Sequence, residues 1–259
     1  MSTLEMQTTQ KKYYRKLNSR TNFDICLTIL MVAVCFITLY PVWYTVVISF
    51  NDAKDALRGG IYWWPRIFSL ESYKSVFMDK SIMNAFMVSI ARTVVGTITS
   101  VLFTAMVGYA FSKKHIFGNK FYLIFGTITM FFSGGLIPQF VVYKNLGLYN
   151  SFWVYILPSL FNFYNMIIFM SFFREMPASL EESAKLDGAN DLLIFVKLIL
   201  PLSMPVVATI ALFNAVGHWN DYFTGVLYIN DAELILIHTS LYRPVESATS
   251  ARAAATVSS

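Results

Sequence analysis

The stretch Ile25–Phe50, ICLTILMVAVCFITLYPVWYTVVISF, contains no charged residue over 26 positions. A transmembrane α-helix needs about 20 mainly apolar residues to cross the hydrocarbon core of a bilayer. We therefore expect a membrane-spanning helix here, with a kink at Pro41, because membrane helices tolerate proline. The run is too long for a signal peptide, and no small-residue cleavage site follows it, so we interpret it as an uncleaved first span.

The composition of the whole chain supports this interpretation. Of the 259 residues, 56% are apolar and 14% are charged, whereas soluble proteins carry about a quarter charged residues. So few charges cannot cover a soluble globule, and the apolar content is too high for a disordered chain. Two cysteines are too few for a disulfide scaffold. We expect an all-α fold, a polytopic membrane bundle of helices.

Four further apolar runs are long enough to cross a bilayer, which makes five recognisable spans. In the second run, Arg92 is expected to lie near the outer membrane boundary with its side chain extended toward water. After Asp231 only Leu234–Ile237 is apolar, so no sixth span is evident. The four runs are Ser81–Ser112, Phe121–Tyr143, Asn145–Phe173 and Leu198–Asn220.

The basic residues between the spans predict the orientation. Five lie before the first span, and the 112–120 loop has three lysines and no acidic residue. Because cytoplasmic loops are enriched in Lys and Arg, we expect the N-terminus and the 112–120 and 174–197 loops to be cytoplasmic. The aromatic segment Ile61–Pro65 then lies outside, in the headgroup zone.

The most informative loop sequence is REMPASLEESAKLDGANDLLIFVKLILPLSMP, residues 174–205. Ser179 and Glu182 have the spacing of a capping box, which predicts the start of a helix. Gly188 is placed to end that helix, and Asn190 or Asp191 can cap a second one. We expect a helix–turn–helix that exposes four carboxylates, those of Glu181, Glu182, Asp187 and Asp191.

The charge of this loop bears on what it contacts. Five acidic and three basic residues lie between Arg174 and Lys197. Helices that lie on lipid usually carry Lys and Arg on their polar face, so the acidic balance disfavours an amphipathic connector along the membrane. It favours the alternative, in which the loop docks into a groove of a soluble partner.

The same residues carry a family resemblance. Glu182-Ser183-Ala184-x-x-Asp187-Gly188-Ala189, followed by Leu200-Pro201, resembles the EAA loop in permease subunits of binding-protein-dependent ABC importers. Ser183 departs from the second alanine of the family's Glu-Ala-Ala pattern. The Asp-Gly-Ala triplet is similar to the carbohydrate branch, and so are residues 132–138, FSGGLIP, and 215–220, AVGHWN. In these segments the chain looks like relatives of the maltose importer's second permease.

The resemblance implies a transport subunit in a bacterial-type inner or plasma membrane, without an enzymatic activity of its own. Its implied partners are a homologous second permease, a dimer of ATP-binding subunits that hold ATP and Mg, an extracytoplasmic solute-binding protein and membrane lipid. Residues 174–200, the coupling loop, would transmit movement of the ATPase to the spans. Its implied contact residues are Glu182, Ser183, Ala184, Asp187, Gly188, Ala189, Leu200 and Pro201.

This interpretation divides the chain into three parts. Residues 1–24 form a cytoplasmic N-terminal segment, 25–230 the transmembrane permease domain, and 231–259 a polar tail that is atypical for the family. The family's sixth span is missing from the pattern, and we expect truncation, a frame change or a short variant to be the cause.

Several polar residues inside the spans are candidates for the translocation pathway, because polar groups in lipid are costly. They are Asn165, Asn214, Trp219 and Asn220. Hydrogen bonding between helices is an equally good explanation for them.

Other functions lack motifs. The chain has no phosphate-binding Gly-x-x-x-x-Gly-Lys motif, no metal-ligand spacing of its three histidines, no catalytic constellation and no basic cluster for nucleic acid. The alternatives left open are a permease for another solute, such as an amino acid or polyamine, and a membrane-embedded enzyme.

Overall fold

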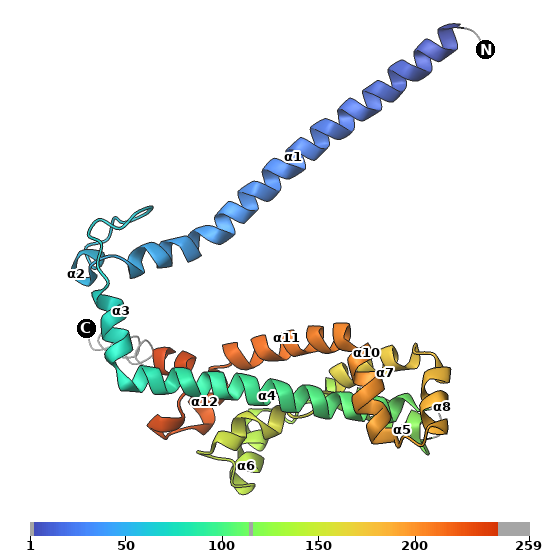
Figure 1. Ribbon diagram of the computed structural model, residues 1–259. Coiled ribbons are helices and arrows are strands. Elements are labelled where there is room, and N and C mark those ends of the chain that lie inside the picture. The colour runs from blue at the N-terminus through green and yellow to red at the C-terminus, as the bar shows by residue number, and fades with distance from the viewer. Residues whose placement is uncertain (1–2, 114–115, 243–259) are drawn as a thin grey trace. The chain divides into compact units, whose positions relative to one another are not determined.

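The computed structural model describes residues 3–113 and 116–242, and the chain forms two compact units, residues 1–78 and 79–259. The described residues form helices and turns without a β-strand; an isolated antiparallel bridge joins Asn51 and Phe68. The prediction of an all-α fold is confirmed (Figure 1).

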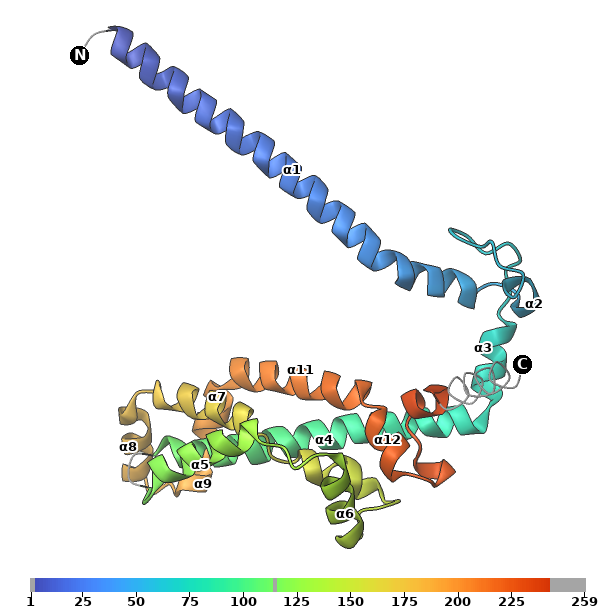
Figure 2. The ribbon, with the colours of Figure 1, turned by 180° about the vertical axis from the view of Figure 1, so that it is seen from behind.

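The first unit contains one long helix and two short ones: α1 (Thr3–Ser49), α2 (Ala53–Ala56) and α3 (Glu71–Met78). Residues 22–49 of α1 are apolar enough to cross a membrane, and none of their apolar window is buried within the chain. Pro41 lies inside this helix without interrupting it. The ribbon of α1 bends toward its C-terminal end (Figure 2), in line with the expected kink.

Asn51 organises the turn that follows α1. Its buried side chain accepts a hydrogen bond from the backbone N–H of Ile67 at 3.0 Å and donates to the carboxylate of Asp55 at 3.0 Å. Asp55 also pairs with Arg66 at 3.3 Å. The indole N–H of Trp43 donates to the carbonyl of Trp63, so the aromatic segment predicted to lie in the headgroup zone is held against α1.

The second unit is built on α4 (Lys80–Ser112), a 33-residue helix. Two helices pack along it, α7 (Phe163–Arg174) and α11 (Met204–Asn220). The other elements are α5 (Asn119–Phe131), α6 (Leu136–Asn145), η1 (Phe152–Tyr155), η2 (Leu157–Ser159), α8 (Ala178–Leu186), α9 (Asp191–Ile194), η3 (Phe195–Ile199), α10 (Leu200–Leu202), α12 (Phe223–Tyr228) and η4 (Ala232–Leu234).

Three of the five predicted spans are bent. Of the described helices, α4 and the apolar part of α1 are long enough to cross a membrane alone. The count reaches five if each of three bent pairs is one span: α5 with α6, bent by 114°, residues 152–159 with α7, bent by 46°, and residues 191–202 with α11, bent by 83°. The sharpest bend follows the extended residue Phe132 and includes Gly135, whose φ of 85° is in a region that favours glycine.

Small residues on α4 let α7 and α11 approach closely. Gly96, Ser100, Thr104 and Gly108 are buried and recur every four residues, so they share one face of the helix. A Cβ at Gly108 would lie 2.8 Å from the Cβ of Phe169 on α7. Small residues at such contacts are typical of membrane helices, whose association depends on close packing.

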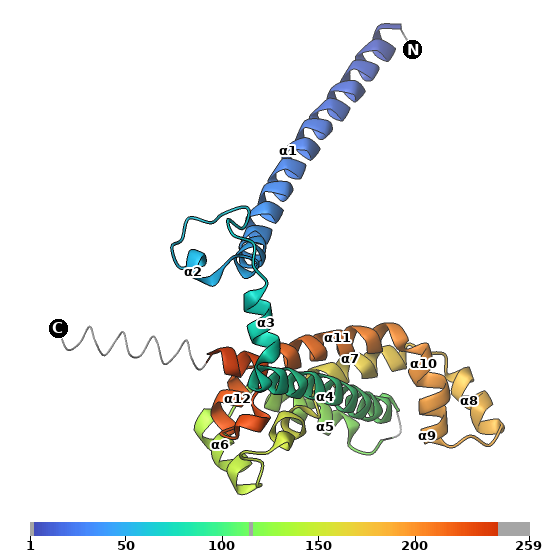
Figure 3. The same cartoon turned by 60° about the vertical axis from the view of Figure 1, so that its left-hand side comes forward.

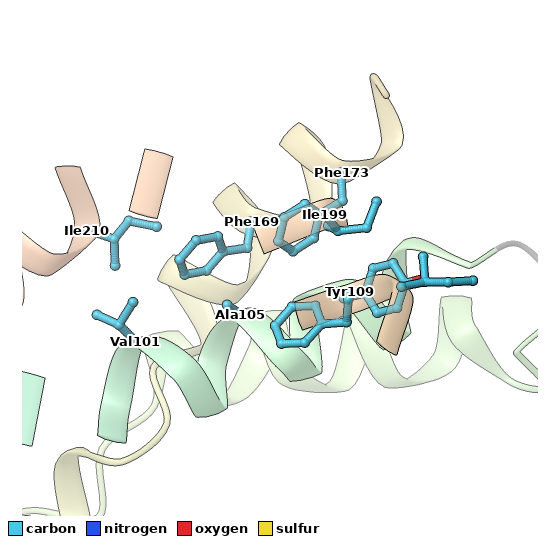
Figure 4. Packing of buried hydrophobic residues seen from close by; sticks show 9 residues of the cluster. Val101, Ala105, Tyr109, Phe169, Phe173, Ile199 and Ile210 are labelled. Atoms are coloured by element: carbon cyan, nitrogen blue, oxygen red, sulfur yellow. The ribbon is translucent and has the colours of Figure 1, made fainter. Parts of the chain in front are cut away.

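Two clusters of buried apolar residues lie in the described part of this unit. Figure 4 shows the first, which joins α4, α7, α9, η3 and α11 and consists of Val101, Ala105, Tyr109, Phe169, Phe173, Ile194, Phe195, Ile199 and Ile210. The second consists of Val154, Tyr155, Ile156, Tyr228, Ile229 and Leu236.

The structure contradicts the expected position of Arg92. Its side chain does not extend toward water but is buried, 3% exposed, and forms an ion pair with Asp221. The Arg92 Cζ atom also lies 4.8 Å from the ring centroid of Tyr155. The expectation failed because the residues that satisfy the charge, Asp221 just after α11 and Tyr155 at the end of η1, lie far away in the sequence.

The described part of the predicted tail, residues 231–242, packs against the rest of the second unit. Leu236 and Thr239 are buried, and the backbone N–H of Ile237 donates to the hydroxyl of Ser89 at 2.9 Å. Residues 243–259 lie outside the described residues.

Candidate functional site

The coupling loop folds as the expected helix–turn–helix. Helix α8 and helix α9 are joined by a short turn, and η3 and α10 continue the chain into α11. Figure 3 shows α8 and α9 at one end of the second unit. The apolar face of α9 and η3 is anchored in the first cluster through Ile194, Phe195 and Ile199.

The predicted capping box at the start of α8 is wrong. The N-cap residue is Pro177, and no side chain makes the capping hydrogen bond. The carbonyl of Pro177 accepts a hydrogen bond from the N–H of Leu180 at 3.2 Å, so the helix begins before Ser179. Ser179 is therefore already helical, and Glu182 is exposed.

The turn after α8 is a complete Schellman motif. The N–H of Gly188 donates to the carbonyl of Lys185, and the N–H of Ala189 donates to that of Ala184, both at 3.0 Å. Gly188 has a φ of 82°, a conformation that side-chain-bearing residues rarely adopt. The structure therefore explains why glycine ends this helix.

The predicted cap of the second helix is confirmed. Asn190 is the N-cap of α9, and its side-chain oxygen accepts a hydrogen bond from the N–H of Leu193 at 2.8 Å. Lys185 and Asp191 pair across the turn at 3.1 Å. Both of these side chains are substantially exposed, so the pair contributes little to stability.

The implied contact residues divide into two groups. Glu182, Ser183, Asp187, Gly188 and Pro201 are exposed, whereas Ala184, Ala189 and Leu200 pack against the first cluster. The sequence interpretation did not single out Leu186, which is 89% exposed between the acidic residues. The sequence offered one indication of its role, which is that Leu186 directly precedes Asp187, a proposed docking residue. We call Glu182, Ser183, Leu186, Asp187 and Gly188 the coupling surface.

Glu181 was expected to be exposed with the other acids, but it is half-buried and paired. Its carboxylate forms an ion pair with the ammonium group of Lys113, which follows the last residue of α4. Nearby, the guanidinium of Arg174 donates to the backbone carbonyl of Phe111 at 3.0 Å. These contacts bring the 112–120 and 174–197 loops to the same end of the unit, as expected of two loops on one side of a membrane.

The candidate pathway residues do not form one site. The side-chain amide of Asn165 on α7 donates to the side-chain oxygen of Asn214 on α11 at 3.3 Å, and Asn214 in turn donates to Ser100 on α4 at 3.4 Å. Trp219 instead packs edge-to-face with Phe86. Asn220 is exposed, and its side chain donates to the carbonyl of Val216.

Asn165 and Asn214 therefore form hydrogen bonds between helices, which is one of the two explanations given for these residues. Within residues 3–113 and 116–242, no three His, Cys, Asp or Glu side chains are grouped so that they could hold a metal ion.

Comparisons with known proteins identify the family of the chain and agree with its fold. Residues 27–259 match the family described as binding-protein-dependent transport system inner membrane component. Protein LplC of Bacillus subtilis (strain 168) is 41% identical over 210 residues, which cover 81% of this chain and 71% of LplC. The polygalacturonan/rhamnogalacturonan transport system permease protein YtcP of the same organism is 40% identical, covering 81% of this chain and 73% of YtcP.

A solved structure is similar as well. It is the crystal structure of a bacterial ABC transporter involved in the import of the acidic polysaccharide alginate, and one of its chains superposes with a TM-score of 0.82. The sequences are 32% identical, and the match covers 87% of this chain and 80% of that chain.

Proposed function

Since the chain belongs to the family of inner membrane components of binding-protein-dependent transport systems, we propose that it moves a carbohydrate across the membrane by coupling to a separate ATPase. It acts as a permease subunit and carries out no chemistry itself. The observation that carries the coupling role is the Schellman turn at Gly188, which presents the coupling surface at one end of the second unit.

The substrate class rests on the relatives. The printed description of YtcP names polygalacturonan and rhamnogalacturonan, and that of the solved transporter names alginate. Both descriptions concern carbohydrate polymers rich in carboxylates. We propose that this chain transports a sugar or oligosaccharide, and that oligomers of uronic acids are the first substrates to test.

The proposed assembly contains four kinds of partner. A homologous second permease completes the pathway, a dimer of ATP-binding subunits docks on the coupling surface, a solute-binding protein delivers the substrate from outside, and lipid surrounds the spans. ATP and Mg belong to the ATPase. In this arrangement the N-terminus and the coupling loop face the cytoplasm, as the distribution of basic residues predicts.

The coupling surface has the features of a helix that docks into a groove of a protein. Glu182 and Asp187 precede and follow Leu186 in the sequence and are exposed, and Leu186 is an apolar side chain with little cover from its own chain. Ala184, Ala189 and Leu200 connect this surface to the core through the first cluster. In the proposed role, a displacement of the exposed residues is transmitted to the spans through these three packed residues. Pro201 lies where the coupling loop joins the span formed by α11.

The pathway assignment follows from the same function. Asn165, Asn214, Trp219 and Asn220 offer amide groups and an aromatic ring, which are the groups that recognise sugars. Asn220, being exposed within this chain, is the member best placed to contact substrate or the second permease.

A substitution at Gly188 tests the coupling role. An added Cβ at this position meets no atom of the chain within 4 Å, but the φ of 82° makes any side chain there strained, so the control has to carry the same backbone strain away from the partner contact. Gly147 provides a matched control: it ends α6 in the same Schellman geometry, has a φ of 72° and also has open space around it. It lies in the turn after α6, far from the coupling surface in the sequence.

The experiment uses the complex expressed with its ATPase, second permease and binding protein. We expect Gly188→Asp to abolish uptake of labelled oligogalacturonides and retention of the ATPase by the tagged permease, while the amount of permease in the membrane stays normal. Gly147→Asp should retain both activities. Unchanged uptake by Gly188→Asp, or equal losses in the two variants, would contradict the coupling assignment.

A further inference from the structure

The ammonium group of Lys113 joins the end of α4 to the coupling loop. It contacts the carboxylate of Glu181 on α8 and donates a hydrogen bond to the hydroxyl of Tyr109 at 2.8 Å. It also lies 4.0 Å from the centroid of the Tyr109 ring. One cation therefore connects two helices that are 68 positions apart in the sequence at this point.

The surroundings make this pair stronger than a typical surface ion pair. The Lys113 and Glu181 side chains are 16% and 25% exposed, whereas those of the neighbouring Lys185–Asp191 pair are 48% and 68% exposed. Partial removal from water strengthens the attraction between opposite charges, and the Tyr109 hydroxyl and ring add favourable contacts with the ammonium.

Tyr109 connects this pair to the core. Its ring is buried in the first cluster and packs against Phe173 at the end of α7 and Phe195 in η3, with centroid separations of 6.1 Å and 5.4 Å. The coupling loop is thus held at two places, at α8 through Glu181 and after α9 through the apolar residues of η3. Both attachments reach α4, since Phe195 of η3 contacts the ring of Tyr109, and from η3 the chain also continues through α10 to α11.

We infer that Lys113 is a positioning residue that transmits movement of the coupling loop to α4. Helix α4 packs against both α7 and α11, so its displacement changes the arrangement of all three. Without Lys113, a partner that moves α8 would act on α4 through the apolar contacts of the first cluster and the hydrogen bond from Arg174 to Phe111. The inference rests on the proposed function, because it assumes that a partner moves the loop.

Four variants test it in the assembled transporter, reconstituted in vesicles with its ATPase, second permease and binding protein. Lys113→Met and Glu181→Gln each remove the ion pair. In the double variant Lys113→Glu/Glu181→Lys the charges are exchanged, and the Tyr109 hydroxyl can donate to the new carboxylate. Lys120→Met removes an exposed lysine of α5 by the same substitution and serves as the control.

The readouts are the ATPase retained on the permease, ATP hydrolysis, and oligogalacturonide uptake per ATP hydrolysed. We expect both single variants to retain the ATPase but to lose about fivefold or more in uptake per ATP, the range of a typical coupling free energy. The exchanged pair should recover most of this loss, and Lys120→Met should match the wild type.

Each contrary result has a distinct meaning. Unchanged uptake per ATP in Lys113→Met, or a failure of the exchanged pair to restore it at normal permease levels, would overturn the inference alone. Loss of the ATPase from Lys113→Met would also overturn it, because Lys113 would then build the docking surface rather than transmit movement. If the wild-type permease retained no ATPase, the proposed function would fail and the inference with it.

Discussion

The guanidinium of Arg92 forms an ion pair with the carboxylate of Asp221, although the two residues are 129 positions apart in the sequence. The guanidinium also donates to the backbone carbonyl of Asp221 at 2.9 Å. The hydroxyl of Thr224 donates to the same carboxylate at 2.6 Å, so both charges have several partners. This pair holds α4 at Arg92 against the turn between α11 and α12.

Replacing Asp221 by Asn should destabilise the protein, because it leaves the buried Arg92 charge without its anionic partner. Breaking a buried pair costs about 3–5 kcal/mol, and the partial exposure of Asp221 favours the lower end. The free energy of unfolding in detergent micelles measures the effect. Glu182→Gln removes an exposed carboxylate and should leave this free energy unchanged; equal values for both variants would show that the pair is not stabilising.

Gly108→Ala should weaken the contact between α4 and α7. The new Cβ would lie 2.8 Å from the Cβ of Phe169 and 3.2 Å from the carbonyl oxygen of Met166, which is backbone and cannot rotate away. Overpacking of this kind costs about 1–3 kcal/mol. Thermal unfolding of the purified permease measures it, with Gly217→Ala as the control, since a Cβ at Gly217 meets nothing within 4 Å.

The result for the control matters as much as that for the variant. Gly217→Ala should keep or slightly raise the unfolding temperature, because alanine favours the helix. A similar fall for both variants would mean that helix propensity, and not close packing at Gly108, determines the effect.

Asn190→Ala should loosen the start of α9. It removes the side-chain acceptor of the Leu193 N–H, and the loss of such a cap costs about 1 kcal/mol. Hydrogen exchange of the α9 amides should become faster, while exchange within α4 stays the same. Asn190→Asp keeps an acceptor at this position and should preserve the slow exchange; fast exchange in that variant would contradict the capping role.

Asn165 and Asn214 should be coupled energetically. A double-mutant cycle with Asn165→Ala and Asn214→Ala, read as free energies of unfolding, should give an interaction of about 0.6 kcal/mol, the average for such bonds between membrane helices. Strictly additive effects would show that their 3.3 Å contact contributes nothing. In that case a structural role for this contact would not compete with the pathway role proposed for the two residues.

Local features of the coupling loop could be predicted from the sequence because their partners are a few residues away. The turn at Gly188 and the cap at Asn190 both use backbone groups within five positions. The error at Ser179 was also local. Both Pro177 and Ser179 could act as the N-cap of this helix. Pro177 takes the extended conformation of an N-cap, so the helix begins after it and not after Ser179.

Residues whose partners are distant could not be placed in this way. Arg92 and Glu181 were both expected to face water because charged side chains usually do, and both are paired with residues that follow the end of another helix. Likewise, the length of the apolar run predicted a span at residues 121–143. Hydropathy carries no information about the direction of the helix axis, and the helices of this segment are bent by 114° relative to each other.

By itself, the sequence determined that the chain is helical and crosses a membrane, and that its scarce charge is concentrated in one acidic loop. Those properties follow from composition and from contacts between near neighbours. Only the tertiary structure decided which charges are buried, since the pairs Arg92–Asp221 and Lys113–Glu181 form when separate helices pack together. The free energy of a buried charge depends on its partner, and the fold supplies that partner.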